Sequence, residues 1–140
     1  MRNAFFLLLL AQGTPCILAG DEFANSQKGN NNVYCQDNPT GWTDWQKSEQ
    51  RKDLRDFVKK LIELRKKYQV FSPAKEMLGI DQVSCGVPDV SYHGENAWRV
   101  PSEVFSRQLG VYYSGAAVGG EDCFVAYNMH WIPHSFALPA

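Results

Sequence analysis

The chain has 140 residues, of which 44% are hydrophobic and 21% are charged, and its formal net charge is −1. This length suits one ordinary domain and is too short for a complete (β/α)8 barrel, which needs about 250 residues. The near-neutral charge excludes an electrostatic case for nucleic acid or an anionic membrane as partner, and no apolar run reaches the roughly 18 residues that span a membrane. We therefore expect a soluble protein.

The four cysteines, Cys16, Cys35, Cys85 and Cys123, are widely spaced. They form no C-x-x-C pair and have no histidine at metal-ligand spacing, so no metal site and no cofactor are predicted. They are also too sparse for a disulfide-dense scaffold. We expect buried free thiols.

The first twenty residues admit two interpretations. Arg2, an apolar run over residues 4–11 and the small residues that follow resemble an export signal. The same residues are good helix formers, and Gly13 with Thr14-Pro15 would end a helix. Residues 16–19 are a short apolar run typical of a strand buried on both faces. A helix over 2–12 and a strand over 16–19 account for both halves of the stretch.

Two adjacent carboxylates, Asp21 and Glu22, follow this predicted strand. Paired carboxylates serve glycosidases as acid and nucleophile. Adjacent residues on an extended chain point to opposite sides, however, so the two cannot easily face one bond together. We expect one carboxylate to accept backbone N–H groups of the following loop.

Residues 23–50 show no periodicity and are rich in Asn, Gln, Asp, Gly and Trp. Tyr34, Trp42 and Trp45 are too apolar for a solvated linker, so we expect an ordered loop packed over another part of the protein. The amides and carboxylate of residues 29–38 could pair with sugar hydroxyls, with the aromatic rings as stacking faces. Alternatively, the asparagines hold the loop against itself through turn hydrogen bonds. Both alternatives stay open.

The clearest element is a helix over residues 52–68. Acidic residues occur in its first turns and Lys66-Lys67 in its last, as the helix dipole favours. Its basic face is interpreted as solvated surface. One apolar stripe at helical spacing is formed by Leu54, Phe57, Val58, Leu61, Ile62 and Leu64.

Beyond a boundary near residues 71–75, glycines and prolines interrupt every apolar run. Residues 109–113 and 123–128 are strand-like and flank a turn-rich segment, which predicts a hairpin, and residues 136–138 predict a further strand. This half is interpreted as the beginning of an antiparallel β domain. The chain is accordingly divided into domains 1–73 and 74–140.

The three histidines, His93, His130 and His134, lack the spacing of a catalytic or metal site. We expect His93 to be structural and His130-Trp131 to pack at the end of a strand. Trp98 could stack on a sugar in a surface groove, but core or interdomain packing is the default.

A longer pattern of motifs resembles a known family. The run LLLLAQGTPCILAGDEFANSQKGNNNVYCQDNPTGWTDW resembles the eighth-strand region of isoamylase-type glycogen-debranching enzymes, which are α-amylase-superfamily glycoside hydrolases of family 13. The pieces DVSYHGENAW, SRQLGVYY and DCFVAYNMHWIPHSFALP are similar to the start of the β domain that follows the barrel in these enzymes.

The resemblance implies an α/β plus all-β fold: the last βα unit of a TIM (β/α)8 barrel followed by part of an antiparallel C-terminal β-sandwich. Residues 1–12 would end the seventh helix, residues 16–19 would be the eighth strand and residues 52–68 the eighth helix. Residues 74–140 would begin the sandwich.

The resemblance also implies a function for the parent enzyme, the retaining hydrolysis of α-1,6 branch linkages in glycogen-like α-glucans in the cytoplasm. The family's three catalytic carboxylates come from the fourth, fifth and seventh strands, so no catalytic residue lies in this chain. The chain would be inactive alone, and its partners would be α-glucan and the N-terminal part of the barrel. The candidates near the substrate cleft are Asp21, Glu22, Asn30, Asn31, Asn32, Tyr34, Gln36, Asp37, Trp42 and Trp45.

Three alternatives remain open. The β half and the Trp-rich loop could form a carbohydrate-binding module that holds glucan without cutting it. The parent enzyme could have another activity of the α-amylase superfamily, such as α-1,4 hydrolysis. The chain could also be a structural or interaction domain, which exposed apolar surface would indicate.

Overall fold

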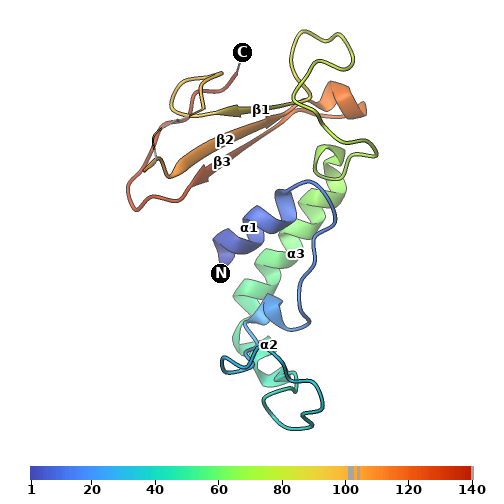
Figure 1. Cartoon of the computed structure of the whole chain (residues 1–140), viewed down its shortest axis with the longest axis vertical. Helices are drawn as coiled ribbons and strands as arrows, with labels where there is room; N and C mark the ends of the chain where they lie inside the picture. Colours follow the sequence, from blue (N-terminus) through green and yellow to red (C-terminus); the bar gives the residue numbers. More distant parts are fainter. Residues whose placement is uncertain (101–102, 104, 140) are drawn as a thin grey trace. The chain divides into compact units, whose positions relative to one another are not determined.

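The computed structural model describes residues 1–100, 103 and 105–139 (Figure 1). They fall into two compact units, Met1–Lys67 and Tyr68–Ala140. The first unit contains the helices α1 (Arg2–Leu10), α2 (Trp45–Gln50) and α3 (Lys52–Lys67), and the second a three-stranded antiparallel sheet. The fold is therefore mixed, and no helix of the described part is both long and apolar enough to cross a membrane.

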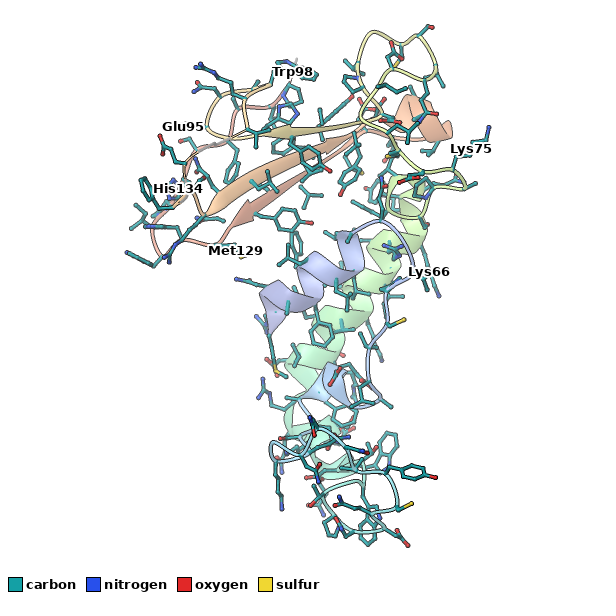
Figure 2. The ribbon with its side chains drawn as sticks, viewed as in Figure 1. Lys66, Lys75, Glu95, Trp98, Met129 and His134 are labelled. Carbon is teal, nitrogen blue, oxygen red and sulfur yellow. The ribbon has the colours of Figure 1, made fainter. Side chains whose placement is uncertain are left out.

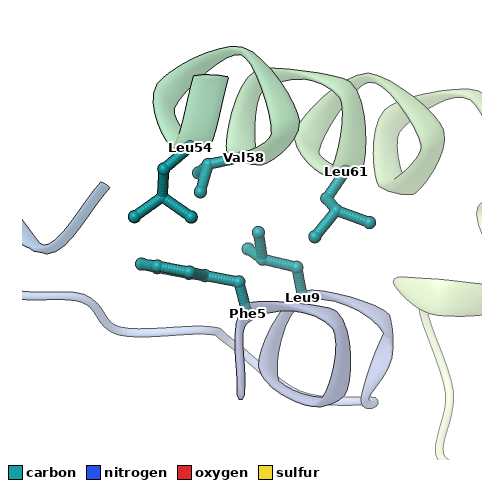
Figure 3. Close-up of a cluster of buried hydrophobic side chains, with 5 residues drawn as sticks. All are labelled: Phe5, Leu9, Leu54, Val58 and Leu61. Atoms are coloured by element: carbon teal, nitrogen blue, oxygen red, sulfur yellow. The ribbon is translucent and has the colours of Figure 1, made fainter. Parts of the chain in front are cut away.

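The core of the first unit lies between α1 and α3, whose side chains fill the space between the two ribbons (Figure 2). Phe5 and Leu9 of α1, four residues apart, lie on one face of that helix and meet the apolar stripe of α3. Both predicted helices are thus confirmed, with α1 ending two residues and α3 one residue earlier than predicted. Figure 3 shows the five buried side chains of this cluster, which are Phe5, Leu9, Leu54, Val58 and Leu61.

Arg65 of α3 completes the end of α1. Its guanidinium donates to the carbonyl oxygens of Leu9 at 2.8 Å and Ala11 at 2.6 Å, and also to that of Gly13. The last carbonyls of a helix have no partner within the helix, and five fixed N–H donors suit Arg to this position. Arg65 therefore satisfies the terminal carbonyl groups of α1, a role that a glycine C-cap motif has in many other helices.

The predicted strand over residues 16–19 does not form within the described residues. The segment pairs with no strand in the described residues, and Ile17 and Leu18 are 41% and 58% exposed. A strand exists through ladder hydrogen bonds to its neighbours, and an apolar run cannot say whether those neighbours are present. What remains is an extended segment with two exposed aliphatic side chains.

The predicted loop over residues 23–50 contains helix α2 at its end. Asp44 caps this helix, because its Oδ1 accepts from the backbone N–H groups of Gln46 at 3.1 Å and Lys47 at 3.4 Å. The sequence TDWQKSEQ thus carries an N-cap signal that the search for apolar periodicity missed.

The sheet of the second unit has the order β1-β2-β3, with β2 (Gln108–Tyr113) in the middle. β2 and β3 (Cys123–Asn128) pair antiparallel with Val111 opposite Val125, which confirms the predicted hairpin. β1 (Val90–His93) was not predicted, and residues 136–138 form no strand. A strand of four residues is too short to show alternation, whereas an apolar triplet alone does not make a strand.

One face of the sheet is built around the buried ring of His93. Its Nδ1 accepts from the backbone N–H of Trp98 at 2.8 Å, so its Nε2 carries the proton and donates to Ser91 Oγ at 2.8 Å. The imidazole also lies 5.8 Å from the Phe124 ring, measured between centroids. Gly110 is paired with His93, and a Cβ there would lie 2.5 Å from the Phe124 ring. The prediction of a structural histidine is confirmed.

Asp89, at 2% exposed, anchors the segment that leads into β1. Its carboxylate accepts from the backbone N–H groups of Leu78 at 2.9 Å, Gly79 at 2.8 Å and Val90 at 2.7 Å, and from the Gln82 side chain. Burial acts to raise the pKa of Asp89, but these hydrogen bonds outweigh it and leave the pKa lowered. A buried charge is thus compensated by donors from one loop.

Three of the cysteines, Cys16, Cys35 and Cys85, are free thiols, as expected, but they are exposed rather than buried. Each lies in a turn or loop, outside the helices and strands that bury side chains. The expectation of burial came from the average behaviour of the residue type and not from the position of these three.

Candidate functional site

The candidate site is the segment from Gly20 to Trp45, which begins with a tight turn. Asp21 Oδ2 accepts from the backbone N–H of Leu18 at 3.0 Å, and Glu22 Oε2 from that of Gly20 at 2.9 Å. Both carboxylates therefore hold backbone N–H groups, as the structural interpretation predicted for one of them. The donors precede the carboxylates, however, and are not in the following loop.

The sharpness of this turn depends on Gly20. Its φ is 100°, in the left-handed region, and a Cβ there would lie 2.6 Å from Cβ of Asn25. Asn25 in turn accepts the backbone N–H of Asp44 on its Oδ1 at 3.1 Å, which ties the start of the loop to the cap of α2. The sequence analysis did not identify Asn25, because a contact across nineteen positions leaves no local pattern.

The asparagines hold the loop through turn hydrogen bonds to their own backbone. Asn30 Oδ1 accepts from the N–H of Asn32 at 2.9 Å, and Asn32 Oδ1 from the N–H of Tyr34 at 3.0 Å. Gln36 spans the same turn, because its Oε1 accepts from Asn30 Nδ2 at 3.4 Å and its Nε2 donates to the Asn32 carbonyl at 3.3 Å. This geometry agrees with the second of the two alternatives, self-support of the loop.

The pattern repeats at Asn38, whose Oδ1 accepts from the N–H of Thr40 at 2.9 Å. Asn38 was not among the predicted site residues. An Asn or Asp two residues before a backbone donor is the local signal that could have identified it.

The three aromatic side chains of the segment are exposed, so the expected packing of this loop over another part of the protein is not seen among the described residues. Tyr34 is 83%, Trp42 is 55% and Trp45 is 72% exposed. Trp42 Nε1 donates to Asp37 Oδ1 at 2.8 Å, and the Trp45 ring lies 6.0 Å from that of the buried Phe23. The reason is local: the loop is ordered by its amide hydrogen bonds and therefore does not need its rings as a core.

The exposed groups of this loop are suited to binding a ligand. Hydrogen bonds fix its backbone, and the side chains of Asn31, Tyr34, Trp42 and Trp45 are exposed. The described residues contain no group of three or more His, Cys, Asp or Glu side chains that could hold a metal ion. Flat rings next to neutral hydrogen-bonding groups suit an uncharged, polyhydroxylated ligand.

The remaining histidines and Trp98 lie in the second unit. The His130 ring stacks on that of Trp131 at 4.1 Å between centroids, which confirms local packing, and Trp131 is 79% exposed. His134 meets His130 edge to face at 5.1 Å. Trp98 is 47% exposed, so it does not lie in the core, and interdomain packing of its ring stays a prediction.

Comparison with known proteins finds relatives that are named for glycogen metabolism. The chain is 36% identical to a protein of Mycobacterium tuberculosis named glycogen operon protein GlgX homolog, over 161 aligned positions that cover 99% of this chain and 21% of that protein. It is 55% identical over 60 residues to a glycogen debranching enzyme of Enterobacter sp., covering 43% of this chain and 9% of that enzyme. A glycogen debranching enzyme of Escherichia fergusonii is 57% identical over 58 residues, which cover 41% of this chain and 8% of that enzyme. No protein-family model matches the chain.

Proposed function

The chain is homologous to glycogen debranching enzymes over a region that covers 21% of its Mycobacterium tuberculosis relative, and from this premise we propose that the whole protein hydrolyses the α-1,6 branch linkages of glycogen-like α-glucans. The chain spans about a fifth of that relative's length, so the proposal concerns a protein in which this region acts together with others. Its substrate would be an α-glucan, and its place the cytoplasm, where glycogen is stored.

The observation that carries the proposal is the loop of residues 29–38 with the rings that follow it. Its asparagines fix the backbone up to Tyr34, and the rings of Trp42 and Trp45 contact Asp37 and Phe23 while remaining more than half exposed. Prior ordering lowers the entropy cost of binding. We assign this loop, together with Asp21 and Glu22, to the edge of the substrate cleft.

Within the loop, structural and ligand-binding roles fall to different residues. Asn30, Asn32 and Gln36 use their side chains for hydrogen bonds within the loop. Asn31 and Tyr34 are exposed. We therefore assign contact with glucan to Asn31, Tyr34, Trp42 and Trp45, and support of the loop to Asn30, Asn32, Gln36 and Asp37.

The segment over residues 16–19 supports the placement of the first unit in a barrel. It is extended, and Ile17 and Leu18 are exposed beside helices that bury their own apolar stripes. A parallel strand needs a neighbour on each side and a covered face. We propose that strands elsewhere in the whole protein supply these, with residues 1–73 as the last βα unit and residues 74–140 as the start of a β-sandwich.

The test is a chimera. The 58 residues of the Escherichia fergusonii enzyme that align with this chain are replaced by those of this chain, and release of reducing ends from amylopectin is measured. We expect the chimera to debranch and the isolated 140-residue chain to release nothing, because the chain lacks the three carboxylates of the family. Cleavage of α-1,4 linkages by the chimera, or hydrolysis by the isolated chain, would contradict the proposal.

Single substitutions in a chimera that carries Met1–Lys67 of this chain test the loop. Tyr34→Ala and Trp42→Ala should each raise KM about tenfold, the equivalent of about 1.4 kcal/mol of binding. Lys59→Ala, an exposed change on α3, is the matched control and should leave KM unchanged. Equal KM values for all three variants would show that the loop does not contact the substrate.

A further inference from the structure

Asn25 joins the two ends of the candidate site. Its side-chain Oδ1 accepts from the backbone N–H of Asp44 at 3.1 Å, across nineteen positions of the chain. Asn30, Asn32 and Asn38 instead accept from backbone N–H groups two positions ahead, so their hydrogen bonds order single turns. Because a turn fixes its own residues alone, the bond from Asn25 is the one of these four that sets where the chain returns after the loop.

The turn that carries Asn25 is held by its own hydrogen bonds. The backbone N–H groups of Phe23 and Asn25 both donate to the carbonyl oxygen of Gly20, at 3.1 Å and 2.9 Å. The N–H of Ala24 donates to the carbonyl oxygen of Asp21 at 3.0 Å, and the ring of Phe23 is buried at 1% exposed. The side chain of Asn25 therefore projects from a fixed backbone, so less conformational freedom is lost when its Oδ1 holds a donor.

The residue that Asn25 holds lies between the two tryptophans assigned to glucan contact. Asp44 follows Trp42 by two positions and directly precedes Trp45. Its carboxylate caps α2, and Trp45 is the first residue of that helix. The Trp45 ring also lies 6.0 Å from the ring of Phe23, which belongs to the same turn as Asn25. A displacement of the Asp44 backbone would therefore move both tryptophans.

We propose that Asn25 is a positioning residue for glucan binding, which acts through Asp44 to fix the backbone from which the rings of Trp42 and Trp45 project. This inference rests on the proposed function, because that function assigns the two tryptophans to glucan contact. Two rings on one fixed segment bind a ligand with less loss of freedom than two rings that move separately. Asn25 does not touch the glucan in this role, so its loss affects binding and not the chemical step.

The first experiment measures kcat and KM for amylopectin in the chimera that carries Met1–Lys67 of this chain. Asn25→Ala should raise KM about fivefold and leave kcat within about twofold, since the lost hydrogen bond acts on binding. Asn25→Asp keeps an Oδ acceptor and should recover about half or more of this loss. Asn25→Ala combined with Trp42→Ala should raise KM by less than the product of the two single effects, because one residue acts through the other.

The second experiment does not depend on activity. Amide hydrogen exchange of the 140-residue chain, measured by mass spectrometry on the peptide that contains Asp44, should be about threefold faster in Asn25→Ala. Ser26→Ala is the matched control in both experiments, because Ser26 Oγ accepts from the backbone N–H of Lys28 at 3.1 Å, a bond that does not reach Asp44. Circular dichroism checks that each variant is folded. Asn25→Ser, whose hydroxyl is one bond shorter than the amide, keeps the test valid if Asn25→Ala unfolds.

Two outcomes would overturn this inference. One is unchanged hydrogen exchange at Asp44 in Asn25→Ala. The other is a KM in the double variant equal to the full product of the single effects, which would mean that Asn25 acts independently of Trp42. The two proposals fail separately: debranching with an unchanged KM in Asn25→Ala refutes only the positioning role. A chimera that does not debranch, while exchange at Asp44 depends on Asn25, refutes only the proposed function.

Discussion

At the scale of single residues, His93 shows how a neutral imidazole can serve as a core side chain. Each ring nitrogen has a partner, with Trp98 N–H donating to one and Ser91 Oγ accepting from the other. The rings of Trp98, Tyr112 and Phe124 surround it, and all three are uncharged. A proton added at Nδ1 would remove the acceptor of the Trp98 N–H group.

This arrangement predicts a stability that depends on pH. Burial lowers the pKa of His93, whereas the unfolded chain keeps an ordinary value of about 6.5. Below pH about 6.5, His93 is therefore protonated in the unfolded state but stays neutral in the folded state. The contribution of His93 to the free energy of unfolding is complete above this pH and is lost as the pH decreases toward the lowered pKa. Urea unfolding at pH 7.5 and pH 5.5, followed by circular dichroism, should give the lower midpoint at pH 5.5.

A variant separates this effect from other titrations. His93→Gln cannot take up the proton, so its midpoint should change less between the two pH values than that of the unchanged chain. Asp81 and Asp89 have lowered pKa values and stay ionised in this range, so they do not contribute. An equal pH dependence in the unchanged chain and in His93→Gln would show that His93 is not responsible.

At the scale of elements, helices α1 and α3 and the β2–β3 hairpin were predictable, whereas helix α2 and strand β1 were not. The stripe of α3 and the apolar run of α1 are local patterns, and each helix satisfies its backbone internally. A strand is a contact between segments, so residues 16–19 and 136–138 look like strands without forming one. β1 was missed for the opposite reason, since four residues between breakers form a strand only because β2 is beside them.

The end of α1 depends on hydrogen bonds from Arg65 of α3, and this predicts the effect of replacing Arg65. Arg65→Ala should lower the free energy of unfolding by about 2 kcal/mol, because three carbonyl groups lose their charged donor. Arg65→Lys should recover less than half of this loss, since an ammonium group lacks the fork of five donors. Urea unfolding measures both variants.

The neighbouring Lys66 is the control for this prediction, because it is exposed and lies in the same last turn of α3. Lys66→Ala removes a positive charge from the end of the helix without touching α1. A loss in Lys66→Ala equal to that in Arg65→Ala would assign the effect to the helix dipole instead of the three hydrogen bonds.

At the scale of the whole molecule, what the sequence could predict depended on the range of the interaction. Motifs of the loop indicated the family of relatives, and the asparagine-rich composition indicated either sugar contacts or self-support, with no means of choosing. The choice needed the partners of each side chain, such as Asn30 with Asn32 and Gln36. The exposure of Trp42 and Trp98 could not be predicted, because the average burial of tryptophan says nothing about a given loop.

The exposed aliphatic side chains make a prediction for the chain in solution. Leu7, Leu8, Ile17 and Leu18 are between 37% and 58% exposed, and no strand pairs with residues 16–19 among the described residues. An extended, apolar and unpaired segment is a template for association. We expect the 140-residue chain to self-associate with rising concentration in sedimentation velocity, and Ile17→Lys with Leu18→Lys to suppress this.

The matched control adds the same two charges elsewhere. Gln46→Lys with Gln50→Lys changes two exposed positions of α2 and should leave self-association as it is in the unchanged chain. Equal suppression by both double variants would mean that net charge, and not residues 16–19, governs association.

The hydrogen bonds of Arg65 finally bear on the order of events in folding. They join residues that are 52 to 56 positions apart, whereas α3 is built from contacts within sixteen residues. Closing a loop of that length costs chain entropy before any bond repays it. We therefore expect α3 to form before α1 is completed, so that replacing Arg65 accelerates unfolding more than it slows folding. The hydrogen bonds of Arg65 would then form late in folding and break early in unfolding.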